Sequence, residues 1–123
     1  MAVPRITKEE LKHRLESADG DRPIIVDVRL KYPYEHSTVT LPDARRMPPG
    51  AVDSASLPRD RDIVLYDSDP DDIVSERTAA ELIRQGFRAF VLAGGIAEWV
   101  AAKFPTNSKP APQLAAPVGA RKG

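Results

Sequence analysis

Cysteine is absent from all 123 positions of the sequence. This absence excludes disulfide bonds, zinc–thiolate sites and catalysis by a thiol of the chain itself. An excess of charge of either sign is also lacking, because 18 basic and 18 acidic residues give a net charge of zero. The charge balance therefore gives no reason to expect a nucleic-acid partner or a membrane-surface partner.

Long hydrophobic runs are lacking as well. No stretch of the sequence approaches the roughly 18 consecutive apolar residues of a membrane-spanning helix. Residues 1–10 also lack the charged-then-apolar pattern of a signal peptide. We therefore expect a cytoplasmic protein with no membrane span.

Hydrophobic residues make up 41% of the chain, which is enough for one modest core. We expect a single folded domain over residues 5–105. The remaining residues, 106–123, contain three prolines and three basic residues but no acidic one. Such a composition buries little apolar surface, so we predict a disordered tail rich in proline and alanine.

Helix signals are present at three places in the predicted domain. Thr7 and Glu10 have the spacing of a capping box, which predicts the start of a helix that ends near Asp19. A second helix is expected over residues 73–85, where Asp71, Asp72 or Ser75 could serve as the cap. A third, short helix should follow the glycines Gly94 and Gly95 and carry Trp99 into the core.

Strand signals alternate with these helices. Short apolar runs predict buried strands at residues 24–28, 63–66 and 89–92. Residues 29–61 contain five prolines, so we expect a loop there, with at most short strands around Ala44 or Val52. The alternation predicts parallel βαβ units, and hence an α/β fold in which helices flank both faces of a small parallel β-sheet.

The segment that follows the strand at 63–66 is the candidate site. In parallel α/β sheets, ligands bind beyond the carboxyl ends of the strands. The free backbone N–H groups at the start of the next helix favour an anion at this place. The segment comprises Asp67, Ser68, Asp69, Pro70, Asp71, Asp72 and Ile73.

Several short motifs within residues 6–105 resemble the rhodanese family and follow that family's order. They are Asp27-Val28-Arg29, Leu41-Pro42-Asp43-Ala44, Ile63-Val64-Leu65-Tyr66, the helical segment from Ser75 to Gly86-Phe87, and Gly94-Gly95-Ile96 followed by Trp99 and Phe104-Pro105. The resemblance implies a rhodanese-like fold. It also implies that the 67–73 loop corresponds to the loop whose cysteine, in that family, carries sulfur from a donor such as thiosulfate as a persulfide.

Asp67 occupies the position at which the resemblance places that cysteine. A carboxylate is a hard oxygen nucleophile, whereas sulfur transfer needs a polarisable thiolate. We therefore expect a degenerate loop, residues 67–73, without a catalytic residue. Its four aspartates should repel an anionic donor. We further expect the carboxylate of Asp67 to accept N–H bonds at the helix start and to fill the anion site itself.

Two other interpretations of this loop involve an oxygen nucleophile or a metal. Residues 63–69 resemble the opening of haloacid-dehalogenase-like phosphatases, in which Asp67 would be phosphorylated beside magnesium. No further acidic pair follows a later strand, as those enzymes require. Asp67, Asp69 and Asp71 also alternate as in a calcium loop, but Asp72 replaces the required glycine and Thr78 the bidentate glutamate.

Other polar residues are interpreted as structural. Asp27 and Arg29 should order the loops at a strand end, and Gly94-Gly95 should allow a close turn rather than bind phosphate. His13, His36, Arg45-Arg46 and residues 59–62 are interpreted as solvated surface positions.

Two functional classes remain open after this reading. The favoured hypothesis is a rhodanese-like domain that is inactive as a sulfurtransferase and serves as a binding or regulatory module. We expect no cofactor and no metal. The sequence does not identify the protein partner of such a module. The alternative is an enzyme with changed chemistry that uses Asp67, for example in metal-assisted hydrolysis of a phosphate ester. A third, minor hypothesis is a decayed domain that binds no ligand.

Overall fold

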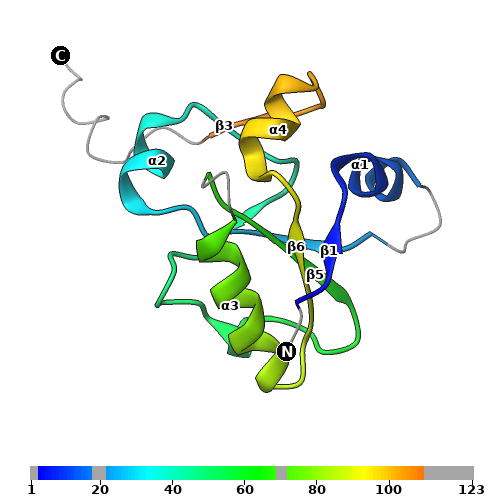
Figure 1. Cartoon of the computed structure of the whole chain (residues 1–123), viewed down its shortest axis with the longest axis vertical. Coiled ribbons are helices and arrows are strands. Elements are labelled where there is room, and N and C mark those ends of the chain that lie inside the picture. Colours follow the sequence, from blue (N-terminus) through cyan, green and yellow to red (C-terminus); the bar gives the residue numbers. More distant parts are fainter. Residues whose placement is uncertain (1–2, 18–21, 69–71, 110–123) are drawn as a thin grey trace, which may run out of the picture.

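A computed structural model of the chain describes residues 3–17, 22–68 and 72–109 (Figure 1). Its strands are β1 (Arg5–Ile6), β2 (Ile24–Asp27), β3 (Val39–Thr40), β4 (Arg45–Arg46), β5 (Asp62–Tyr66), β6 (Arg88–Leu92) and β7 (Asn107–Ser108). Its helices are α1 (Lys8–Glu16), α2 (Lys31–His36), α3 (Ile73–Arg84) and α4 (Gly95–Ala101), with a 3₁₀ turn at Ser54–Ser56. None of the helices in the described ranges is long and apolar enough to cross a membrane.

Five strands form one parallel sheet in the order β1-β6-β5-β2-β4. The three predicted strands are its three central members, because the run at 24–28 contains β2, the run at 63–66 lies in β5 and the run at 89–92 lies in β6. The predicted α/β class with a small parallel sheet is therefore confirmed. A second, two-stranded sheet joins β3 to β7 in antiparallel fashion.

Helices cover both faces of the parallel sheet, as predicted. Ala79 and Leu82 of α3 pack against one face, together with the alternate strand residues Val26 and Ile63. Leu11 of α1 and Ile96 and Trp99 of α4 pack against the other face, together with Ile25 and Val64. Successive strand residues point to opposite faces, so a strand buried on both sides must be apolar throughout. Figure 1 shows α3 and α1 on opposite sides of the strands.

The start of α1 matches its sequence signal. Glu10 N–H donates to Thr7 Oγ1 at 3.0 Å, and Thr7 N–H donates to Glu10 Oε1 at 3.0 Å, which makes a complete capping box. The helix ends at Glu16, before the predicted end near Asp19, which lies outside the described residues.

The prediction that residues 29–61 form a loop is wrong for one segment, because α2 lies within it. Pro33 is tolerated there since it occupies the first turn, where a backbone N–H would have no helical partner. A short strand does occur next to Ala44, namely β4, whereas Val52 is in no strand.

The ordered domain also extends beyond the predicted boundary at residue 105. Asn107 and Ser108 pair with Thr40 and Val39 in the small sheet. Asp43 N–H donates to Asn107 Oδ1 at 2.9 Å, and Lys109 N–H donates to the Thr38 carbonyl at 2.9 Å. Residues 106–109 therefore belong to the folded domain, which corrects the prediction of a tail that starts at 106. Residues 110–123 lie outside the described part.

Candidate functional site

Asp67 directly follows β5 at the carboxyl edge of the sheet, where the site was predicted. Its side chain is buried, with 1% of the residue exposed. Oδ2 of Asp67 accepts a hydrogen bond from the backbone N–H of Ser75 at 2.6 Å. Ser75 is the third residue of α3, so this N–H is one of those that lack a partner within the helix. The expected contact between Asp67 and the helix start is present.

The backbone of Asp67 is held from the opposite side by α4. Ile96 N–H donates to the Asp67 carbonyl at 3.1 Å. Gly95 has a φ of +60°, and a Cβ at this position would lie 2.3 Å from the Asp67 carbonyl oxygen. Only glycine permits this approach, which agrees with the interpretation of Gly94-Gly95 as a close turn.

Asp72 closes the loop in a left-handed conformation, with a φ of +58°. It is 3% exposed, and its Oδ2 pairs with Arg5 Nη1 at 2.7 Å and accepts the Gly94 N–H at 3.0 Å. Asp72 precedes α3 but makes no side-chain cap bond. The charge of Asp72 is therefore paired with Arg5, which also contacts Glu76 at 2.8 Å. The expected repulsion of anions by the loop stays a prediction. The second carboxylate oxygen of Asp72, Oδ1, is buried without a hydrogen-bond partner in the described ranges.

The remaining predicted loop residues divide into two groups. Ser68 is half-buried and Ile73 is 46% exposed at the start of α3. Asp69, Pro70 and Asp71 lie outside the described residues. No group of three acidic or histidine residues that could hold a metal exists among the described residues. The calcium-loop hypothesis falls on the undescribed positions and stays a prediction.

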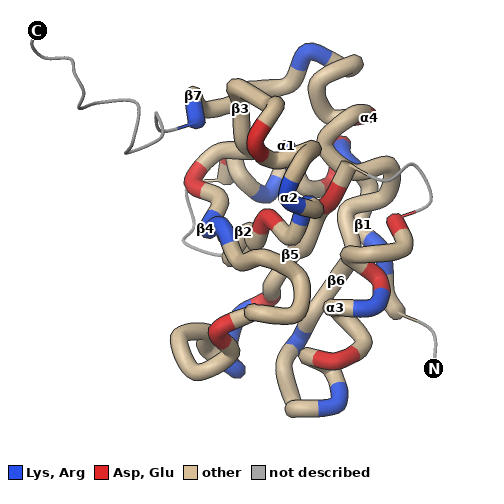
Figure 2. Tube along the Cα trace, turned by 90° about the vertical axis from the view of Figure 1, so that its left-hand side faces the viewer, with Lys and Arg blue, Asp and Glu red and all other residues tan. Residues whose placement is uncertain are grey.

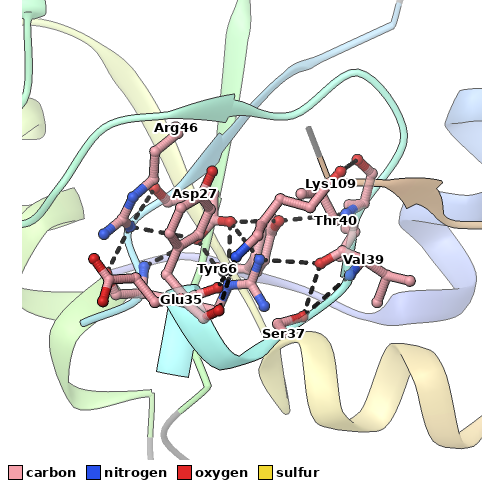
Figure 3. Close-up of polar contacts among 11 residues, drawn as sticks. Asp27, Glu35, Ser37, Val39, Thr40, Arg46, Tyr66 and Lys109 are labelled. Carbon is pink, nitrogen blue, oxygen red and sulfur yellow. Dashed lines mark hydrogen bonds and ion pairs between the residues drawn. The ribbon is translucent and has the colours of Figure 1, made fainter. Parts of the chain in front are cut away.

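Asp27 and Arg29 form a buried ion pair. Figure 3 shows Asp27 beside Tyr66, the residue that precedes the loop. Arg29 Nη2 lies 2.7 Å from Asp27 Oδ2, and both residues are 1% exposed. Tyr66 Oη donates to the same Asp27 oxygen at 3.0 Å and accepts the Leu41 N–H at 3.3 Å. Burial, followed by the charge of Asp27, raises the pKa of Tyr66 far above its ordinary value. Since Tyr66 immediately precedes Asp67, the network fixes the position at which the candidate loop starts.

Arg46 and Lys109 extend the network outward through Tyr34. Arg46 Nη1 donates to the Arg29 carbonyl at 2.6 Å, so Arg46 is not the plain surface charge that we expected. The Arg46 guanidinium and the Lys109 ammonium lie 4.1 and 4.3 Å from the centre of the Tyr34 ring. Lys109 Nζ also donates to the Tyr34 carbonyl at 2.5 Å. Sequence reasoning missed Tyr34, Arg46, Tyr66 and Lys109 as parts of one cluster, because nothing local in the sequence connects them.

Comparison with known proteins agrees with this geometry. The family model for the rhodanese-like domain matches residues 7–102. A tRNA sulfurtransferase from Desulfurococcus amylolyticus is 37% identical over 98 residues, which are 80% of this chain but only 18% of that protein. The chain thus corresponds to less than a fifth of this relative.

Solved structures share the fold over most of the chain. The rhodanese-like domain of an Anabaena protein, solved by NMR, has a TM-score of 0.72 at 27% identity, covering 92% of this chain and 89% of that one. A Bacillus halodurans protein has a TM-score of 0.73 at 20% identity, covering 90% and 83% of the two chains.

Proposed function

This chain belongs to the rhodanese-like domain family, and we propose that it is a member without sulfurtransferase activity that serves as a binding or regulatory module. The tRNA sulfurtransferase relative supports a setting in sulfur metabolism, where a domain of this size forms a small part of a larger protein. In such a setting the present domain would contribute recognition rather than sulfur chemistry.

The observation that carries the proposal is the contact between Asp67 Oδ2 and the Ser75 N–H. A persulfide requires a sulfur nucleophile, and the chain contains no cysteine at this or any other position. The helix start that would stabilise a thiolate or an anionic donor already has a carboxylate as its partner. The loss of the nucleophile and the occupation of the anion site should therefore both oppose sulfurtransferase activity.

Sulfur transfer from thiosulfate to cyanide is the direct test. We expect a purified preparation to form no thiocyanate above a control without protein. Thiocyanate formation in proportion to protein concentration would overturn the proposal.

A second measurement tests whether the anion site is filled. In the Asp67→Ala variant, millimolar thiosulfate should shift the amide NMR resonance of Ser75, because the N–H groups of the helix start become available to an external anion. The unsubstituted chain should show no such shift. Equal shifts in the two proteins would mean that the side chain of Asp67 does not exclude anions.

The alternative, hydrolysis of a phosphate ester by Asp67 with a metal, is less well supported. A nucleophile must reach its substrate, whereas Asp67 is 1% exposed and its Oδ2 is engaged by the helix. We expect no magnesium-dependent hydrolysis of p-nitrophenyl phosphate. Hydrolysis that is lost in the Asp67→Asn variant would favour the enzyme.

A further inference from the structure

A groove of about 540 Å³ lies along α3, and Asp67 is not among the residues that line it. Val74, Arg77 and Thr78 of α3 line one side, and Pro49, Gly50, Val52 and Ser54 line the other. Leu30 closes the end nearest to α2. We call this feature the α3 groove. Its volume lies in the range of about 300–1,000 Å³ that is typical of small-molecule sites.

The floor of the α3 groove is apolar. Leu82 is 2% exposed and belongs to the core, and the half-buried Val52 and Val74 pack against the same core. Leu30 is 52% exposed and adds apolar surface at the end of the groove. Covering these groups with an apolar ligand would remove hydrocarbon surface from water and is favourable at about 25 cal/mol per Å².

Two charged residues line the α3 groove, Arg77 and Glu81. Glu81 already has a partner, since its Oε1 lies 2.6 Å from Arg84 Nη2. The side chain of Arg77 has no hydrogen bond and no ion pair with any residue in the described part of the chain. The groove therefore combines an apolar floor with one cation, Arg77, that has no ion-pair partner among residues 3–17, 22–68 and 72–109.

We propose that the α3 groove binds a small amphipathic carboxylate, whose apolar chain lies on Val52, Val74 and Leu82 and whose carboxylate pairs with Arg77. The planar guanidinium matches a carboxylate in shape and can donate two parallel N–H bonds to it. A single free cation balances a single negative charge. A phosphate monoester would bring a second charge close to Glu81, which disfavours it. The inference does not depend on whether the domain transfers sulfur.

The test is an NMR titration of the full-length chain with octanoate and, separately, with the neutral octanamide. Octanoate should perturb the amides of Val52, Val74 and Thr78, and it should bind more tightly than octanamide. Arg77→Gln should weaken octanoate binding by roughly five-fold, corresponding to one partly exposed ion pair, and leave octanamide unaffected.

Matched variants make the result specific. Arg61→Gln removes an exposed arginine that does not line the groove and donates to the carbonyl of Arg22, which does not line it either, so octanoate binding should be unchanged. Thr78→Trp fills the groove and should abolish binding of both compounds, provided that the circular dichroism spectrum shows a folded protein. Asp67→Ala should leave octanoate binding intact, which separates this site from the candidate loop.

Several outcomes would overturn the proposal. They are equal affinity for octanoate and octanamide, an Arg77→Gln variant that binds octanoate normally, and perturbations confined to other regions. The NMR titration is also carried out with a peptide that ends in a free leucine carboxylate. If the peptide perturbs the α3 groove and octanoate does not, the occupant is a protein segment and the small-molecule assignment is wrong.

Discussion

The side chain of Asp67 caps α3 although it precedes the helix by six residues. Asp72, which directly precedes α3, has a left-handed backbone conformation. Its carboxylate accepts hydrogen bonds from Arg5 and from the Gly94 N–H, and it does not cap the helix. The N–H of Ser75 therefore depends on Asp67 for a partner. A buried N–H group without a partner is costly, so this one contact stabilises the loop and α3 together.

Removal of the Asp67 carboxylate should reveal this role. We expect Asp67→Ala to lower the free energy of unfolding by about 1–3 kcal/mol, because it leaves the buried N–H of Ser75 unsatisfied. Asp67→Asn retains an oxygen acceptor and should cost less. Urea denaturation of both variants at pH 7 provides the comparison. Equal stability of the alanine and asparagine variants would show that the cap does not contribute.

Gly95 permits a different contact at the same place. Gly95→Ala should destabilise the protein for two reasons, the strain of a side chain at a φ of +60° and the clash of the new Cβ with the Asp67 carbonyl. Gly50→Ala is the matched control, since its φ is +82° and nothing lies within 4 Å of its added Cβ. We expect about 1–2 kcal/mol from strain alone at Gly50 and a larger loss at Gly95. Similar melting temperatures for the two variants would contradict the proposed clash.

At the scale of elements, α2 is held in place by residues from distant parts of the chain. Its Tyr34 ring contacts the cations of Arg46 and Lys109, and Lys109 also binds the carbonyls of Tyr34 and Glu35 near the helix end. A helix of six residues is too short to be stable alone. Its existence therefore depends on β4 and on the strand β7 that precedes Lys109.

Two truncations, at different points of the chain, separate the contribution of residues 106–109 to thermal stability from that of the residues that follow. Deletion of residues 106–123 removes β7 and Lys109, and we expect the melting temperature to fall by more than about 4 °C, equivalent to roughly 1 kcal/mol for a domain of this size. Deletion of residues 110–123 keeps both and should leave the melting temperature nearly unchanged. Thermal unfolding followed by circular dichroism measures the two. Identical melting temperatures would mean that β7 does not stabilise the domain.

Over the whole molecule, acidic and basic residues are interspersed along the trace (Figure 2). Some of them connect elements that are far apart in the sequence. Asp62, at the start of β5, contacts Arg14 of α1 at 3.0 Å and Arg88 of β6 at 2.8 Å. Burial by itself would raise the pKa of Asp62, but the hydrogen bonds from Arg88 and Arg14 outweigh it and hold the pKa below its ordinary value.

The depressed pKa of Asp62 predicts a loss of stability in acid. The folded state binds this proton less readily than the unfolded chain, whose aspartate pKa is about 3.9. The contribution of Asp62 is therefore complete above about pH 5 and is lost as the pH falls through the folded-state pKa. We expect Asp62→Asn to be less stable than the unsubstituted chain at pH 6, with a smaller difference at pH 3. A difference that stays constant or grows in acid would contradict this assignment.

Local patterns in the sequence determined the three central strands of the sheet, the helices α1, α3 and α4, and the contact of Asp67 with the start of α3. The buried strands at 24–28, 63–66 and 89–92 were predictable because a strand covered on both faces must be apolar at every position. The Thr7–Glu10 capping box and the filling of the helix start by Asp67 were predictable because they follow from backbone N–H groups at known positions. Absence of cysteine excluded thiol chemistry from composition alone.

The tertiary structure alone decided the contacts between residues that are distant in the chain. Arg5 pairs with Asp72 from 67 positions away, and Lys109 binds α2 from 75 positions away. Arg46 likewise donates to the distant carbonyl of Arg29, which makes it part of a buried network. The pairing of β3 with β7 extends the folded domain beyond residue 105. A side chain's charge and length indicate that it can form an ion pair, but only the path of the backbone decides which partner comes within reach.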